Sequence, residues 1–341
     1  MKRLLLLLTG LFLTVGCLRL PIRAADAPAV SAGRGVVMDA DTGELLWSRH
    51  PDTPGLIAST TKIMTAYLAC EAGELERPVS IPAQAVGVEG SSLYLREGER
   101  LTREELLLGT MLQSGNDAAL ALAIDTAGSE EAFVARMNER ARVLGLQNTH
   151  YANPHGLDSD GNFGSARDLA LLTARALQNP DFRRVSATRS AIVAGDRVLT
   201  NHNKLLWRCP GCIGVKTGYT RAAGRLLVSA AERDGRRLIC VTVNDPDDWQ
   251  DHIALLDWGF EQYEPRQVAA AGERLMTAPG GRGLIAGAEL KLLLRPGEEV
   301  RLVFRPGLIS ELIPGADAGT VRVCLNGGVV GEIPVSWEKS N

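Results

Sequence analysis

The strongest indication of both architecture and chemistry is the stretch Ala58-Ser59-Thr60-Thr61-Lys62-Ile63-Met64-Thr65. Apolar residues recur at helical spacing over residues 63–68, which predicts a helix that begins at Ser59. Positions i and i+3 of a helix share a face, so the Ser59 hydroxyl and the Lys62 amine are expected to meet. A serine is a weak nucleophile until a base takes its proton, and a lysine is such a base when burial or a second cation disfavours its ammonium form. In isolation, a helix-capping serine followed by a surface lysine explains the same four residues.

Two further short motifs follow along the chain. Residues Ser114-Gly115-Asn116 separate two helical patterns, so a loop there can present a hydroxyl and an amide to a cleft. Lys216-Thr217-Gly218 ends an apolar run, and a lysine with a threonine can bind a carboxylate while the glycine lets a ligand approach the backbone. An ordinary interhelical turn and an edge-strand lysine explain each motif alone. Either motif arises by chance in roughly one such chain in ten, so all three in this order form a strong joint signal.

The spacing of apolar residues divides the chain into a mixed unit and a later β-rich unit. A hairpin is predicted over residues 35–48, a helical region from about residue 102 to about residue 180, and a helix over residues 248–263. Capping-box patterns at Thr102 and Ser165 are predicted to begin two of the helices. Strands are predicted over residues 213–216, 225–231, 237–243, 290–294, 300–304, 321–325 and 329–334. The predicted fold class is α/β, with a sheet-and-helix domain over residues 30–264 and a small all-β domain over residues 265–341.

The N-terminus has the features of an export signal. Lys2 and Arg3 precede an apolar run over residues 4–15, which is shorter than the roughly 20 residues of a membrane-spanning helix, and small residues follow around Ala25. Residues 1–25 are therefore predicted to be a signal peptide, and the protein is expected to be exported. Retention of this segment as an anchor and lipidation of Cys17 are the alternatives.

Composition limits the classes of function. The chain of 341 residues is 45% hydrophobic and 23% charged, with a formal net charge of −3. This composition allows a large core and excludes collagen-like, low-complexity and disordered proteins. No basic stripe or Lys/Arg run occurs, so binding to nucleic acid has no electrostatic support.

Five of the six cysteines follow the predicted leader, and an odd number of cysteines cannot all pair within one chain. Cys70, Cys240 and Cys324 lie in apolar runs and are expected to be buried, inert thiols. Cys209-Pro210-Gly211-Cys212 has the spacing of a redox pair or of half a zinc site, but no second pair of cysteines or histidines accompanies it. The sequence favours a local disulfide or two loop thiols there, and no metal site is predicted.

In combination, the three motifs make the chain resemble the low-molecular-mass penicillin-binding proteins that act as D-Ala-D-Ala carboxypeptidases. The resemblance runs from about residue 35 to the C-terminus, and includes Asn-Pro-His-Gly-Leu at 153–157, Asn-His-Asn-Lys-Leu-Leu at 201–206 and the trailing β domain. It implies a β-lactamase/transpeptidase-like domain in which an antiparallel sheet packs against a helical cluster. Two features depart from the family pattern: the Cys209/Cys212 pair, and a C-terminal stretch without an amphipathic membrane-binding helix. Peripheral association with a membrane is therefore left open.

The resemblance implies the catalytic roles residue by residue. Ser59 would be the nucleophile and Lys62 its general base. Ser114 would pass a proton to the leaving D-alanine. The backbone N–H groups of Ser59 and Tyr219 would form the oxyanion hole, a contact of about 3–4 kcal/mol per donor.

The resemblance also implies a substrate-binding set. Asn116 would hold Lys62 and the substrate amide, Lys216 and Thr217 would bind the terminal carboxylate, and Gly218 would allow the close approach. Tyr219 completes this set through its backbone. His155 matches a family loop near the active site, where a structural role is favoured over a catalytic one.

The partners implied are peptidoglycan stem peptides as substrates and β-lactam antibiotics as covalent inhibitors, with no cofactor and no metal. The expected location is the bacterial cell envelope or the extracellular space. A class A β-lactamase would need a glutamate that activates the deacylating water, and no such loop motif is evident between Ser114 and Lys216. A D,D-endopeptidase shares the same machinery, and a catalytically silent peptidoglycan- or penicillin-binding protein would have no need to keep Ser59 and Lys62.

Overall fold

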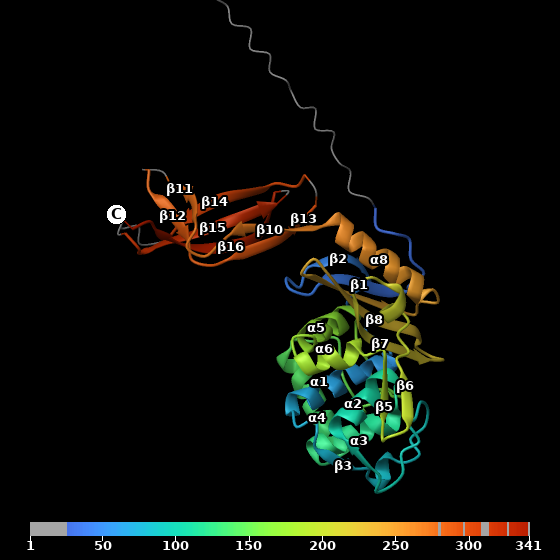
Figure 1. Ribbon diagram of the computed structural model, residues 1–341. Coiled ribbons are helices and arrows are strands. Elements are labelled where there is room, and N and C mark those ends of the chain that lie inside the picture. The colour runs from blue at the N-terminus through green and yellow to red at the C-terminus, as the bar shows by residue number, and fades with distance from the viewer. Residues whose placement is uncertain (1–25, 279–280, 296, 308–313, 326, 340–341) are drawn as a thin grey trace, which may run out of the picture.

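The computed structural model describes residues 26–278, 281–295, 297–307, 314–325 and 327–339. The predicted signal peptide, including Cys17, lies outside the described residues. Two units follow one another along the described chain (Figure 1): a sheet-and-helix unit that ends with α8 (Asp248–Gln262), and an all-β unit that begins with β10 (Glu264–Ala269). The α/β fold class with a trailing β domain is confirmed.

A five-stranded antiparallel sheet forms the centre of the first unit, with strand order β2-β1-β9-β8-β7. Its strands are β1 (Arg34–Asp39), β2 (Leu45–Arg49), β7 (Cys212–Thr220), β8 (Gly224–Arg233) and β9 (Arg236–Val243). Strands β8 and β9 are nearly continuous apolar runs because both faces of the sheet are covered. Helix α8 packs on one face, and α5 (Ala166–Ala176) packs on the other with the rest of the helical cluster (Figure 1). Strand β7 is an edge strand, and its free edge faces the start of α1 (Lys62–Ala72).

Helix α1 runs through the middle of the helical cluster, and its first nine residues are all buried. Its neighbours are α2 (Arg103–Leu112), α3 (Asn116–Ala127), α4 (Glu130–Val143), α5 and α6 (Pro180–Ala187). The predicted capping box at Thr102 is confirmed, because its hydroxyl accepts from Glu105 N and the Glu105 carboxylate accepts from Thr102 N. The remaining short elements are the 3₁₀ turns η1 (Ala58–Thr61) and η2 (Ala83–Ala85), the helix α7 (Leu205–Arg208), and the hairpins β3 (Pro78–Ser80)–β4 (Arg100–Thr102) and β5 (Ser190–Val193)–β6 (Arg197–Thr200).

Three expectations need correction. Ser59 lies in the 3₁₀ turn η1, and the α-helix begins at Lys62 rather than at the serine. Residues 144–165 form loops and turns within the region predicted to be helical. Cys324 is only partly buried, whereas Cys70 and Cys240 are buried as expected.

The C-terminal unit packs a two-stranded sheet, β10–β13 (Leu290–Leu294), beside a five-stranded sheet. The larger sheet has the order β11 (Arg274–Thr277), β12 (Gly283–Ala286), β16 (Gly328–Trp337), β15 (Asp317–Leu325), β14 (Val300–Pro306). The four strands predicted in this region correspond to β13–β16, while β10, β11 and β12 were not predicted. The division between domains at residue 264 stays a prediction. Within the described ranges, no helix is both long and apolar enough to cross a membrane.

Candidate active site

The three sequence motifs meet at the free edge of β7. A hollow of about 340 Å³ opens there between the η1 turn, the α2–α3 junction and β7. Its lining includes five of the eight predicted site residues: Ser59, Ser114, Thr217, Gly218 and Tyr219. The other three, Lys62, Asn116 and Lys216, are buried next to these residues.

Lys62 is held so that it can take a proton from Ser59. Its side chain has 0% exposure, and its Nζ lies 3.0 Å from Ser59 Oγ, 2.7 Å from Asn116 Oδ1 and 2.6 Å from the backbone oxygen of His155. The amide and backbone oxygens can only accept hydrogen bonds. In the neutral amine, the two N–H groups therefore point at these oxygens, and the lone pair is left to face the Ser59 hydroxyl.

The electrostatic surroundings favour that neutral amine. Burial holds the pKa of Lys62 well below its usual value, and the positive charge of Lys216 lowers this pKa further, while Asp117 opposes the shift. Burial also lowers the pKa of Lys216, to about 7. Both causes are the ones that turn a lysine into a general base.

A tight backbone contact fixes the η1 turn that carries Ser59. Gly156 has φ +88°, and a Cβ added there would lie 2.0 Å from Ala58 O and 3.0 Å from Ser59 N. The Asn153 side chain shapes this loop, since its Oδ1 accepts from Gly156 N at 2.7 Å. The same loop presents the His155 carbonyl to Lys62. The Asn-Pro-His-Gly-Leu segment therefore positions both Ser59 and Lys62.

We expect Gly156→Ala to destabilise the protein by more than about 1 kcal/mol and to slow acylation of Ser59, because the added methyl group must displace the η1 turn. Gly145→Ala is the matched control, since Gly145 also has positive φ (+72°) but an added Cβ there meets nothing within 4 Å. The control should lose only about 1 kcal/mol from backbone strain and should keep its acylation rate. Urea denaturation and the rate of labelling by a fluorescent penicillin measure the two effects. Equal acylation rates in the two variants would contradict the positioning role.

Ser114 and Asn116 flank a strained junction between α2 and α3. Ser114 has φ +62°, a conformation that is uncommon for a residue with a side chain. Its Oγ is buried without a hydrogen-bond partner among the described residues, and Ser114 lines the hollow. The Asn116 amide is fixed from two sides, since Oδ1 accepts from Lys62 and Nδ2 donates to the Glu89 carbonyl at 2.5 Å. A strained, unpartnered hydroxyl at a cleft is typical of a functional site.

Strand β7 places the third motif against the nucleophile's turn. A Cβ on Gly218 would lie 3.2 Å from the Thr60 side chain, so the glycine permits this close packing. Side chains alternate along a strand, and Thr217 and Tyr219 both reach the hollow. Lys216, in contrast, is 1% exposed, and its Nζ donates to the Thr217 carbonyl at 3.0 Å.

The contacts of His155 agree with the structural role favoured from the sequence. Burial, and then the charge of Lys62, lowers the pKa of its ring to about 4, so the ring is neutral at pH 7. The ring nitrogen Nδ1 accepts from Leu157 N at 3.3 Å. It is the backbone carbonyl of His155 that meets Lys62, which the sequence did not reveal.

The sequence analysis also missed Asp117. Its carboxylate accepts from Ser92 Oγ at 2.6 Å, from Leu93 N at 3.0 Å and from Leu95 N at 3.1 Å. These bonds hold the loop that brings Ser91 to the edge of the hollow. An acidic residue directly after Ser-Gly-Asn, at the start of a predicted helix, was the available signal.

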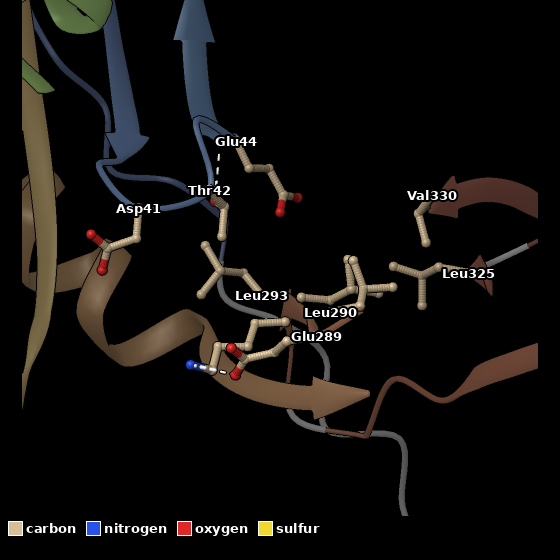
Figure 2. Close-up of a pocket in the computed structure, with 10 residues that line it drawn as sticks. Asp41, Thr42, Glu44, Glu289, Leu290, Leu293, Leu325 and Val330 are labelled. Atoms are coloured by element: carbon tan, nitrogen blue, oxygen red, sulfur yellow. Dashed lines mark hydrogen bonds and ion pairs between the residues drawn. The ribbon is translucent and has the colours of Figure 1, made fainter. Parts of the chain in front are cut away.

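A second hollow, of about 640 Å³, lies where the β1–β2 turn approaches the C-terminal domain. Figure 2 shows Asp41, Thr42 and Glu44 on one side of it and Leu290 and Leu293 on the other. None of the residues of the three sequence motifs lines this second hollow. The lysine that does line it, Lys291, forms an ion pair with Glu289 at 2.7 Å. Greater volume therefore does not identify the active site, whereas the serine–lysine contact does.

Comparison with known proteins identifies the family that the three motifs resemble. The family model described as D-alanyl-D-alanine carboxypeptidase matches residues 22–247. The chain is 30% identical to the D-alanyl-D-alanine carboxypeptidase DacF of Bacillus subtilis, over 90% of this chain and 85% of that one. It is 36% identical to the carboxypeptidase DacB2 of Mycobacterium tuberculosis, over 70% of this chain and 86% of that one.

The solved structure of the D-alanyl-D-alanine carboxypeptidase DacD from Francisella tularensis superimposes with a TM-score of 0.81 at 26% identity, and the match covers 94% of this chain and 95% of that one. The similarity thus includes the C-terminal β domain as well as the domain that carries Ser59 and Lys62. By motif geometry, sequence and fold together, the chain belongs to the D-alanyl-D-alanine carboxypeptidase family of serine peptidases.

Proposed function

We propose that this protein hydrolyses the terminal D-alanine from peptidoglycan pentapeptides through an acyl-enzyme on Ser59. The observation that carries the proposal is the buried Lys62 Nζ, 3.0 Å from Ser59 Oγ and fixed by two oxygens that can only accept. A pair held in this way activates the serine without a histidine. The test is release of D-alanine from a synthetic pentapeptide by the purified protein, and its loss after treatment with penicillin.

In acylation, Lys62 takes the proton of Ser59, and Oγ attacks the carbonyl carbon of the penultimate D-alanine. The backbone N–H groups of Ser59 and Tyr219 hold the resulting oxyanion. The C–N bond then breaks as the proton held by Lys62 passes through the Ser114 hydroxyl to the leaving amine, which leaves Lys62 neutral again. The strained position of Ser114 beside the hollow and its unpartnered Oγ support this relay.

In deacylation, Lys62 takes a proton from water as the water attacks the ester carbon. The ester C–O bond then breaks, the proton passes from Lys62 to Ser59 Oγ, and the shortened peptide leaves with a free carboxylate. A β-lactam acylates Ser59 by the same attack on its ring amide, but its leaving nitrogen stays tethered to the acyl group. Covalent inhibition by β-lactams follows from this chemistry.

The carboxylate of the terminal D-alanine is proposed to bind Thr217. The buried Lys216, next to Thr217 on β7, is proposed to supply the positive charge. In the free protein, burial lowers the pKa of Lys216 to about 7. A bound carboxylate favours the charged form and raises that pKa. Asn116 is proposed to bind the substrate amide through the remaining N–H of its side chain.

Amidating the C-terminal D-Ala of the pentapeptide should lower kcat/KM by about ten- to a hundred-fold, because a charge-assisted hydrogen bond contributes about 1.5–3 kcal/mol. An L-Ala terminus should also fail, since it redirects the methyl group and the carboxylate. For the acid substrate alone, KM should rise as the pH passes above about 7, where Lys216 loses its proton in the free enzyme. The measurement compares release from the acid and from the amide at several pH values.

The Lys216→Met variant distinguishes the possible roles of this lysine. Loss of the preference for the acid, with activity on the amide retained, supports carboxylate binding. If kcat/KM falls equally for the acid and the amide, Lys216 serves proton transfer or structure instead. If the wild-type protein cleaves the amide as fast as the acid, the D,D-endopeptidase reading replaces the carboxypeptidase one.

The proposal also includes the surroundings in which the protein acts. The charged, apolar and small-residue pattern of residues 1–25 supports export to the cell envelope or the extracellular space. Peripheral membrane association is a further option, which fractionation of cells that express the full chain would test. Recovery of the protein with its leader intact from the cytoplasm would contradict export.

A further inference from the structure

The Cys209-Pro210-Gly211-Cys212 segment folds as a tight turn between α7 and β7. Cys212 N donates to Cys209 O at 3.2 Å, and Gly211 has φ +74°. Proline at the second position and a left-handed glycine at the third are the features of a type II β-turn. Such a turn places its first and fourth Cα atoms within about 7 Å, and disulfides join Cα atoms about 4.4–6.8 Å apart.

The turn is held rigidly against β8. Glu232 N donates to Gly211 O at 2.9 Å, and Arg233 Nε donates to Pro210 O at 3.2 Å. A Cβ on Gly211 would lie 2.2 Å from Glu232 O, so the backbone is pressed against its neighbour. The two cysteines therefore stay close to one another without any rearrangement of the fold.

Both thiols contact the same apolar cluster beneath α8. Burial raises the pKa of both, that of Cys212 to about 12, while Arg233, whose Nη2 lies 3.7 Å from Cys209 Sγ, opposes the shift at Cys209. Both are free thiols in this structure, and their raised pKa values favour the protonated form. Within the described ranges, no group of three or more His, Cys, Asp or Glu side chains is arranged to hold a metal, so the half-zinc alternative finds no further ligands there.

We propose that Cys209 and Cys212 form an intramolecular disulfide when the protein meets a disulfide-bearing oxidant. One thiol loses its proton and attacks the oxidant, which releases one thiol and leaves a mixed disulfide. The second cysteine loses its proton and attacks the mixed disulfide, releasing the second thiol, so two electrons and two protons pass to the oxidant. The bond ties the end of α7 to the first residue of β7, the strand that carries Lys216. The inference rests on the turn and does not depend on the proposed catalytic function.

The test uses the full chain, treated either with oxidised glutathione or with a phosphine reductant, then denatured and alkylated. Trypsin cuts after Arg208 and Lys216, so both cysteines fall on one peptide, residues 209–216. After oxidation this peptide should carry no alkyl group, and its mass should be two hydrogens below that of the unalkylated dithiol peptide. After reduction it should carry two alkyl groups. Cys70, Cys240 and Cys324 serve as internal controls and should be alkylated in both samples. Alkylation of both turn cysteines after oxidation, or Cys209 joined to Cys240, would overturn the proposal.

A thermal measurement tests whether the bond constrains the fold. Oxidation should raise Tm by about 3–6 °C, from the loop-closure entropy that a short disulfide removes from the unfolded chain. In the Cys209→Ser/Cys212→Ser double variant, the same oxidation should leave Tm unchanged, because Pro210 and Gly211 still form the turn. A Tm increase of equal size in the double variant would show that the stabilisation comes from elsewhere and would contradict the inference.

Discussion

Ser59→Ala is expected to abolish covalent labelling by a fluorescent penicillin and to lower D-alanine release by at least about 10³-fold, while the fold is retained. The reason is geometric, since Ser59 Oγ is the hydroxyl placed 3.0 Å from the buried Lys62 amine. Among the described residues, the Ser59 hydroxyl bonds only to Lys62 Nζ, and the η1 turn is held by its backbone and by Gly156. The melting temperature should therefore stay close to that of the wild type.

Ser91→Ala is the matched control for this experiment. Ser91 lines the same hollow but is exposed, and the structure shows no contact between its hydroxyl and Lys62 among the described residues. The control variant should label as fast as the wild type. If Ser59→Ala still labels, and peptide mapping places the adduct on another serine, the assignment of the nucleophile is wrong.

Much of this site could be predicted from the sequence because its chemistry depends on local spacing. A serine and a lysine three residues apart meet whether the segment is an α-helix or, as here, a 3₁₀ turn that leads into one. The helix boundary was therefore wrong by one turn without any effect on the pairing. Ser114 and Lys216 were found in the same way, since each belongs to a short motif, the first at the α2–α3 junction and the second within β7.

What could not be predicted depends on contacts between distant segments. The His155 carbonyl that fixes Lys62 comes from 93 residues further along the chain, and a backbone oxygen leaves no mark in the sequence. The Ser165 capping box is only half formed. The Ser165 hydroxyl accepts from Asp168 N, but the Asp168 carboxylate accepts from Asn148 N and Thr149 Oγ1 instead of from Ser165 N. In each case a tertiary contact replaced the local one that the pattern suggested.

The position of Lys216 shows how burial changes the meaning of a motif. From the sequence, its amine was expected to bind the substrate carboxylate directly. In the structure the side chain is almost fully buried, and Thr217 is the neighbour that reaches the hollow. After the larger effect of burial, the charge of Lys216 also lowers the pKa of Lys62. A proton on Lys216 therefore favours the neutral base as well as the bound carboxylate.

The second large effect is expected for Lys62→Arg, which should lower acylation by about 10²–10⁴-fold, the usual contribution of a general base. A guanidinium stays protonated at any pH that the protein tolerates, so it cannot take the proton of Ser59. In the wild type, kcat should rise with pH through an apparent pKa below about 10.4, the value for a free lysine, because burial and Lys216 both disfavour the ammonium of Lys62. That rising limb should be absent in the variant.

Since Lys62 is fully buried, the larger guanidinium could disturb packing, and Lys62→Met is the second variant that separates chemistry from folding. It fills a similar volume without any basic group, and it should be equally slow to acylate while it keeps a cooperative unfolding transition. Lys204→Arg, at an exposed lysine that lines the same hollow, is the matched control and should label like the wild type. Circular dichroism reports the fold, and stopped-flow labelling reports the rate at each pH. Acylation at the wild-type rate by a folded Lys62→Arg or Lys62→Met protein would mean that another group takes the proton of Ser59.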